Sequence, residues 1–437
     1  MVSIAAAAVM ISGGKAQAQI IQQAVGGVAI STEGVLTVIK TDTLRDVAKM
    51  RRKALAQLPG DLYQPTKLRS ISLSRLQQTI AACQKEHRPL PDDIRYLAGL
   101  QRVEYVFLDP QHHDIVLAGP AEGWVVNEQG EVVGAKNGRA VLRLEDLLVA
   151  LRSADQARNG GISCSIDPTP EGMKRLQDYF AGKRTIGDPD RTTGEIEAAL
   201  GQQTISVGGV PGSSHFALVM VAADHQMKRL AMNFEPSPVK DLPSYLSMLS
   251  PAKTIQTPRW WLAANYEPLL KDEDGLAWQL RGTGVKCLTE EDHFNQSGGR
   301  EHTGKANPLA QKWADKMTEK FDELSAKDTI FGSLRNCMDL AVVASLIMQE
   351  HLDSKADCRL DLLMDAKQLP IEEYQVPKQV ATQASFVKKG RNYIISASGG
   401  VLFQPWAVIR DSKVDSSAAA ARGKVVETAK TTSWWWN

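Results

Sequence analysis

The sequence lacks an excess of either charge. Its 51 Lys and Arg residues are matched by 50 Asp and Glu residues, so the formal net charge is +1 at pH 7. Proteins that bind nucleic acid through its phosphates need a basic excess, because lysine and arginine must neutralise the backbone. We therefore expect no nucleic-acid partner.

Closely spaced metal ligands are also missing. The chain has 5 widely spaced cysteines, with no C-x-x-C pair and no H-E-x-x-H motif. Metal sites normally use such spacings. The adjacent histidines His112 and His113 follow Asp109 and Pro110, and an Asp-Pro pair is typical of a turn. We expect no bound metal.

The one phosphate-binding signature is incomplete. Residues 299–306 read GREHTGKA and match G-x-x-x-x-G-K, but Ala306 stands where a Ser or Thr would bind magnesium. The preceding residues, 290–297, are polar, whereas a P-loop follows an apolar strand. This segment therefore favours a loop, and we expect no cofactor.

The N-terminal residues have the pattern of a secretory signal. An apolar run ends at Ile11, and Ala16-Gln17-Ala18 forms an A-x-A peptidase site. We predict that residues 1–18 are a signal peptide. No later segment has the roughly 18 uncharged apolar residues that a transmembrane helix requires. The cleaved protein is therefore expected to be soluble, without a transmembrane segment, and exported to the periplasm or the cell surface.

The rest of the chain predicts an α+β fold with two mixed domains of strands and helices. In the first domain, 19–158, alternating apolar residues predict strands at 103–108 and 114–118. Apolar residues at helical spacing predict helices at 74–85 and 143–153. Strands and helices in layers over this length are typical of one α+β domain.

A composition change separates the expected domains. Residues 159–201 are rich in Gly, Pro, Asp and Thr, which is typical of a linker. The second α+β domain is expected at 202–412. It contains a predicted helix at 216–232 and a largely apolar one at 331–352, which we expect to be its central buried helix.

Residues 413–437 are expected to form a flexible tail, because 415–430 contain few large apolar residues. The tail ends in Trp434, Trp435 and Trp436, and soluble proteins seldom leave so much apolar surface in water. One alternative is docking onto the parent domain. The other is binding to an envelope protein or surface component, since interfaces favour tryptophan. We predict that the tail is an anchoring peptide and that its tryptophans are binding residues.

A cysteine is the first candidate nucleophile. Cys164 follows glycines at 160–161, which permit a tight, exposed backbone. His215 and His225 downstream are candidate bases, with Asp224 as the orienting acid. The alternative is a short strand that carries a half-buried cysteine, and no local protease signature opposes it.

Ser214 is the second candidate nucleophile, because His215 follows it directly. However, G-x-S-x-G is absent, and neighbours in sequence rarely form a catalytic triad. Glycines at 208, 209 and 212 favour a turn from a strand into a helix.

Several segments resemble an uncharacterised family of exported bacterial proteins, known from planctomycetes and described only as a domain of unknown function. The segments are residues 90–100, 115–124, 223–230 and 334–341. The resemblance implies export and a shared fold, and it assigns no catalytic residue.

Because no catalytic motif is complete, we expect a non-catalytic protein of the cell envelope that binds or scaffolds another component. The alternative is an extracytoplasmic hydrolase with Cys164 or Ser214 as nucleophile.

Overall fold

The fold is a mixed α+β arrangement, as the sequence predicted. The computed structural model describes residues 23–55, 60–182, 188–249, 255–256, 258–294, 300–302, 304–387, 392–394, 397–429 and 435–436. The expected signal peptide, residues 1–18, lies outside the described residues, as does Trp434.

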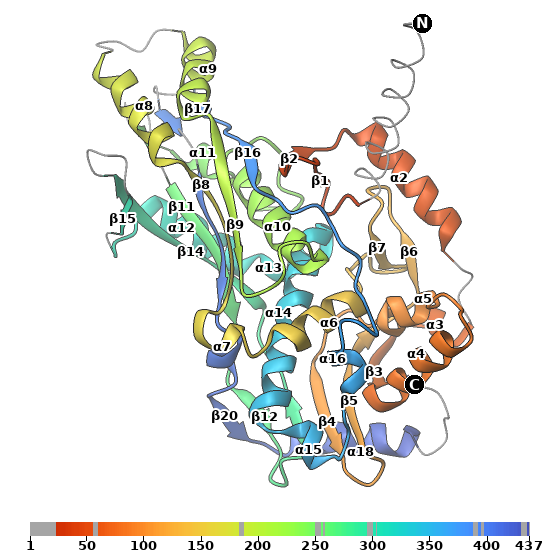
Figure 1. Cartoon of the computed structure of the whole chain (residues 1–437). Helices are drawn as coiled ribbons and strands as arrows, with labels where there is room; N and C mark the ends of the chain where they lie inside the picture. Colours follow the sequence, from red (N-terminus) through yellow and green to blue (C-terminus); the bar gives the residue numbers. More distant parts are fainter. Residues whose placement is uncertain are drawn as a thin grey trace, which may run out of the picture.

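The larger of two main sheets forms one side of the molecule (Figure 1). Its middle strands β9, β8 and β19 are antiparallel neighbours, and β19 runs parallel to β11. In spatial order, its described strands are β1 (Val28–Ile30), β2 (Val35–Val38), β16 (Gln379–Ala381), β9 (Gln202–Gly208), β8 (Ile162–Pro168), β19 (Ser398–Phe403), β11 (Pro258–Asn265), β14 (Gly284–Phe294) and β15 (Arg300–His302).

The second main sheet lies on the other side of the central helices. Its strands in order are β20 (Ser412–Val414), β12 (Leu269–Lys271), β13 (Ala277–Gln279), β4 (Tyr105–Asp109), β5 (Asp114–Ala121) and β3 (Thr66–Ser72). Two small sheets complete the described strands: β10 (Ile255–Gln256), β18 (Asn392–Ile394) and β17 (Ser385–Val387) in one, and β6 (Trp124–Val126) and β7 (Val132–Gly134) in the other.

Both main sheets combine strands from the two expected domains. The larger sheet joins β1 and β2 to β16, and the second joins β4 to β13. The expected boundary at 159–201 therefore does not separate two independent sheets. Strand β8, inside that stretch, alternates buried and part-exposed residues and lies in the middle of the larger sheet. Pairing between distant segments decides this arrangement, and local composition does not report it.

Helices fill the space between the two main sheets (Figure 1). The central ones are α6 (Leu144–Ser153), α10 (His215–Ala231) and α14 (Thr329–Gln349). The other helices of the described residues are α2 (Thr41–Ala54), α3 (Gly60–Tyr63), α4 (Leu73–Lys85), α5 (Asp92–Arg95), the 3₁₀ turn η1 (Leu97–Gly99), α7 (Ala157–Gly160), α8 (Pro170–Ala181), α9 (Pro189–Leu200), α11 (Tyr245–Met248), α12 (Pro308–Glu319), α13 (Phe321–Lys327), α15 (Leu352–Lys355), α16 (Asp361–Met364), α17 (Pro405–Val408) and α18 (Ser417–Ala429).

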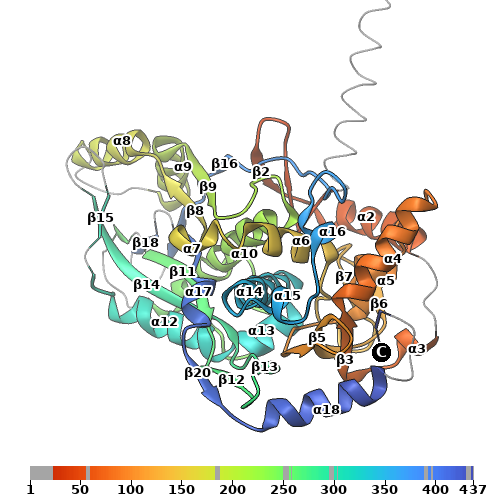
Figure 2. The same ribbon diagram turned by 60° about the horizontal axis from the view of Figure 1, so that its bottom comes forward.

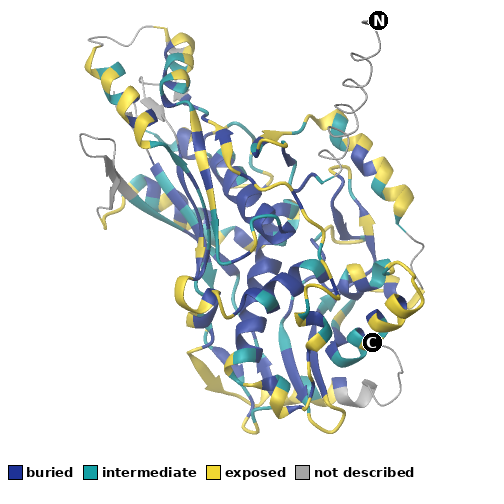
Figure 3. Ribbon diagram, viewed as in Figure 1, coloured by how far each residue is buried: buried dark blue, intermediate teal, exposed yellow. Residues whose placement is uncertain are grey.

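Helix α14 is the central buried helix that the sequence predicted. It packs against α6, α10 and α13. Within the described part of the chain, it is the one helix long and apolar enough to cross a membrane by length and composition, and 94% of that stretch is buried inside the protein. Figure 3 shows the same contrast, with buried residues in the central helices and exposed residues on the projecting helices α8 and α9.

The C-terminal region differs from the expected flexible tail. Helix α18 forms where a linker was predicted, and its Ala418 and Val425 are buried against Phe107 and Ala277 (Figure 2). Alanine has the highest helix propensity, so the Ala-rich sequence that suggested a linker equally supports a helix. The tail therefore covers one face of the second sheet.

Trp435 docks onto the chain itself. It is 2% exposed, and its carbonyl accepts a 2.8 Å hydrogen bond from the backbone N–H of Ser72 on β3. Trp436 forms an antiparallel bridge with Ile71, and its ring lies 5.6 Å from the guanidinium carbon of Arg69. Of the two alternatives for the tail, these contacts favour docking onto the parent fold.

Candidate functional site

Cys164 is not placed as a nucleophile. It lies on the buried face of β8 and is 4% exposed. Burial, with Asp224 nearby, raises the pKa of its thiol, so the reactive thiolate is disfavoured. Asp224 pairs instead with Lys228, whose ammonium lies 2.8 Å from the carboxylate in the core. The half-buried strand cysteine was thus the better interpretation, and the burial is nearly complete.

Ser214 caps helix α10. Its buried hydroxyl accepts from the backbone N–H of Ala217 at 3.2 Å and donates to the carbonyl of Pro211 at 2.6 Å. The hydroxyl proton is therefore already donated to Pro211. The neighbouring His215 forms its hydrogen bond with Asp146 and not with Ser214. Ser214 and His215 therefore do not bond to each other.

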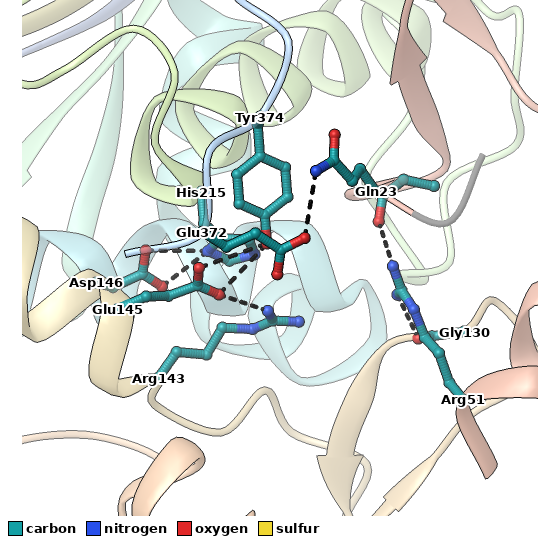
Figure 4. Close-up of polar contacts among 10 residues, drawn as sticks. Gln23, Arg51, Gly130, Arg143, Glu145, Asp146, His215, Glu372 and Tyr374 are labelled. Carbon is teal, nitrogen blue, oxygen red and sulfur yellow. Dashed lines mark hydrogen bonds and ion pairs between the residues drawn. The ribbon is translucent and has the colours of Figure 1, made fainter. Parts of the chain in front are cut away.

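His215 belongs to a buried polar network at the N-terminus of α10 (Figure 4). Its Nδ1 lies 2.9 Å from the carboxylate of Asp146 on α6. Beside it, the guanidinium of Arg143 donates to Glu145 at 2.8 Å, and the hydroxyl of Tyr374 lies 3.5 Å from the same carboxylate. The network joins α6, α10 and the segment before β16, and each charged group drawn in it has a partner.

A cavity of about 300 Å³ opens beside this network. Arg143 and Glu145 line it and pair with each other. Both are mostly buried, with 19% of each side chain exposed. Their pairing leaves no buried charge free for a ligand, so this cavity is a weak candidate for a binding site.

A larger cavity, of about 500 Å³, lies at the other end of α10. Its walls come from residues 26–44, which include β1 and β2, and from the β6–β7 hairpin, α10, and the junction between α13 and α14. Small-molecule sites are typically concave and few per protein, with a few convergent polar groups. The polar side chains that line this cavity include Glu131, His225, Gln226, Arg229, Glu235 and Asp328.

Gln226 bridges two carboxylates in this cavity. Its side-chain amide nitrogen donates to Glu235 Oε2 at 2.9 Å and to Asp328 Oδ2 at 3.1 Å. Glu235 is also paired with Arg229, whose guanidinium lies 2.8 Å from the other carboxylate oxygen. The amide therefore holds two acids from different segments side by side, and only one of them is neutralised.

Asp328 is the second of these acids. It caps α14, where its Oδ1 accepts a 3.3 Å hydrogen bond from the backbone N–H of Ile330. Burial raises the pKa of its carboxyl to about 6, and the negative charges of Glu235 and Glu131 act in the same direction. Glu131 is itself buried and accepts a 3.0 Å hydrogen bond from the N–H of Gly26. Among the residues that the structure describes, neither Asp328 nor Glu131 forms an ion pair.

His225 is the predicted site residue that lines this cavity. Its side chain is 8% exposed, and its Nδ1 has no hydrogen-bond partner. Burial, with the nearby cations Arg229 and Lys228, lowers the pKa of the imidazole to about 3. The ring is therefore neutral at physiological pH, and a neutral imidazole offers one acceptor nitrogen.

The structure separates most of the candidates named from the sequence. Cys164 lies in the larger sheet, and Asp224 lies on the face of α10 that packs against that sheet. Ser214 and His215 lie at the start of α10, and of these candidates only His225 lines the large cavity. Within the described ranges, no group of three or more His, Cys, Asp or Glu side chains is arranged to hold a metal ion.

One comparison finds a family model that is similar to a segment of the chain that includes part of the cavity wall. A family model described as "Protein of unknown function (DUF1598)" matches residues 164–245. The match begins inside β8 and extends through α8, α9, β9 and α10, so it includes His225, Gln226 and Arg229. Comparisons with curated proteins and with solved structures gave no match.

Proposed function

We propose that the protein is an exported, non-catalytic protein of the cell envelope that binds a small polar component in the 500 Å³ cavity beside α10. One observation carries the proposal: the cavity gathers convergent polar groups, two of them carboxylates without an ion-pair partner among the described residues. Both candidate nucleophiles, by contrast, are buried, and the Ser214 hydroxyl is already bonded to Pro211. Such a cavity is the default place for a ligand.

Capture of a ligand from envelope extract tests this proposal. The full chain is incubated with the small-molecule fraction, passed through a desalting column and denatured, and the released compounds are identified by mass spectrometry. Val38→Trp places a large side chain on the cavity wall, where Val38 is 45% exposed, and should abolish capture. The matched control Val414→Trp, on exposed β20, should capture as the parent does. Equal capture by both variants would place the ligand elsewhere.

The hydrolase alternative is tested by covalent labelling under native conditions. Thiol-reactive and serine-reactive probes should leave Cys164 and Ser214 unmodified, because both side chains are buried. Stoichiometric modification at either residue, located by peptide mass spectrometry, would restore the hydrolase interpretation.

We also propose that the C-terminal tail contacts an envelope protein or surface component. Trp436 is only partly buried, so part of its indole ring remains open to a partner, and interfaces favour tryptophan. Deleting residues 433–437 should release the protein from the envelope fraction, and the loss of the buried Trp435 should also lower the melting temperature. A large loss of melting temperature with unchanged location would instead assign the tail to self-docking alone.

A further inference from the structure

We infer that the 500 Å³ cavity takes an organic cation, a ligand with a primary ammonium group and about the size of an amino acid or amino sugar. This inference rests on the proposed function and specifies its ligand. The juxtaposition that carries it is two carboxylates without a cationic partner, Asp328 and Glu131, beside the unpaired imidazole nitrogen of His225.

The cations already in the cavity are occupied. The guanidinium of Arg229 binds Glu235 at 2.8 Å, and the ammonium of Lys327 binds Glu323 at 2.8 Å. Of the charged groups that line the cavity, this pairing leaves Asp328 and Glu131 with uncompensated negative charge. Removing a carboxylate from water is costly unless a positive charge accompanies it. A cationic ligand supplies that charge.

The acceptors fit an ammonium group better than the other ligand classes. A primary ammonium has three donors and no acceptor. The two carboxylates provide acceptors only, and a neutral imidazole provides one acceptor nitrogen. Calcium needs six to eight oxygen ligands, and no three-residue metal group occurs within the described residues. An anionic ligand would be repelled by the two carboxylates, Asp328 and Glu131. These comparisons select an organic cation.

Acid should weaken binding, because Asp328 binds a cation only when ionised. The titratable and charged groups that line the cavity are Glu131, His225, Arg229, Glu235, Lys327 and Asp328. Since burial raises the pKa of Asp328 to about 6, the loss of affinity should begin near that pH and not near pH 4. His225 stays neutral over this range, because burial lowers its pKa to about 3.

Calorimetric titration of the full chain with lysine amide tests the inference, with Nα,Nε-diacetyl-lysine amide as the neutral probe. Lysine amide should bind and the diacetyl form should not. Asp328→Asn and Glu131→Gln should each lower the affinity about tenfold, as expected for one partly desolvated charge contact. Glu319→Gln removes the same charge from an exposed site, 70% exposed, and should leave the affinity unchanged.

The outcomes separate this inference from the proposed function. Equal binding of both probes, equal loss in Glu319→Gln, or no binding of lysine amide would overturn the cation assignment. Recovery of a neutral or anionic compound from extract, with loss in Val38→Trp, would keep the proposed function and overturn the cation. An extract that yields no ligand, together with no binding of lysine amide, would overturn both.

Discussion

Helix α10 carries two histidines in opposite surroundings. His215, at its first residue, is 3% exposed and lies 2.9 Å from the carboxylate of Asp146. His225, ten positions later, is 8% exposed, keeps an unpaired Nδ1 and lines a cavity. Burial is thus similar, and only the partners differ.

The difference distinguishes a structural polar group from a candidate binding group. A buried polar group that has its partner stabilises one packing arrangement, whereas an unpaired one costs free energy unless something outside the fold satisfies it. By that criterion, His215 is part of the scaffold and His225 belongs to the site. The predictions below test this contrast, ordered by the size of the effect at pH 7.5.

The largest effect is expected at Asp146. Asp146→Ala leaves His215 Nδ1 without its acceptor in the core, so we expect a loss of about 3 kcal/mol in the free energy of unfolding. Asp146→Asn retains an oxygen acceptor and should lose clearly less. Urea denaturation of both variants measures the difference. Equal losses would mean that volume, and not the hydrogen bond to His215, determines the cost.

The second effect, at Asp328, has the opposite sign. Burial raises the pKa of this carboxyl from 3.8 to about 6, so its ionised form destabilises the folded state. Asp328→Asn keeps the oxygen that caps α14 but loses the hydrogen bond from Gln226, so the net gain at pH 7.5 should be about 1 to 2 kcal/mol. A more stable variant that has lost ligand binding is typical of a functional residue.

The pH dependence of the Asp328 effect follows from the same shift. Below about pH 4 the carboxyl is protonated in both the folded and the unfolded chain, so the variant should have no advantage there. The advantage should grow as the pH rises to about 6 and remain constant above it. Thermal melts from pH 4 to 8 would measure this curve, and a gain that is independent of pH would contradict the assignment.

Ser214 provides the third test, because it caps the end of α10 that carries His215. Ser214→Ala removes the hydrogen bonds to Ala217 and Pro211, and we expect a loss of about 1 kcal/mol. Hydrogen exchange should increase in the first turn of α10 and not around His225. Faster exchange along the whole helix would show that the two ends are not independent.

How far the sequence predicted these features depends on whether the signal is local. The central helix α14 and helix α10 follow from apolar periodicity, and the structure confirms both. Strand β8 also had a local signal, the alternation of Ile162, Cys164 and Ile166, but the surrounding glycines and prolines suggested a linker.

The candidate site was less predictable, because its acids come from distant segments. His225 could be named as a candidate from the sequence because histidine is a common catalytic base. Glu131 and Asp328 belong to no motif, and Asp328 has the sequence pattern of an ordinary helix cap. Gln226 binds both Asp328, which is 102 positions away in the sequence, and Glu235, which is 9 positions away. Only the fold brings these groups together. Asp146, which holds His215 from 69 residues away, was missed for the same reason.

The smallest effect at pH 7.5 is expected at His225, and it should grow in acid. His225→Phe removes both ring nitrogens, and the cavity that His225 lines can take up the larger ring, so the free energy of unfolding should change by no more than about 0.5 kcal/mol. Below about pH 6.5 the unfolded parent chain binds a proton on this imidazole, whereas the folded protein, with a pKa of about 3, does not. The parent should therefore lose stability as the pH falls from about 6.5 towards 3.

The Phe variant should resist that loss and gain about 1 to 2 kcal/mol over the parent at pH 5. Urea denaturation at pH 7.5 and pH 5 measures the difference. His87→Asn is the matched control, because His87 is exposed and its positive φ of 53° suits asparagine. The control should follow the parent at both pH values. If the Phe variant did so too, the imidazole of His225 would have a proton acceptor in the folded state, and the contrast with His215 would disappear.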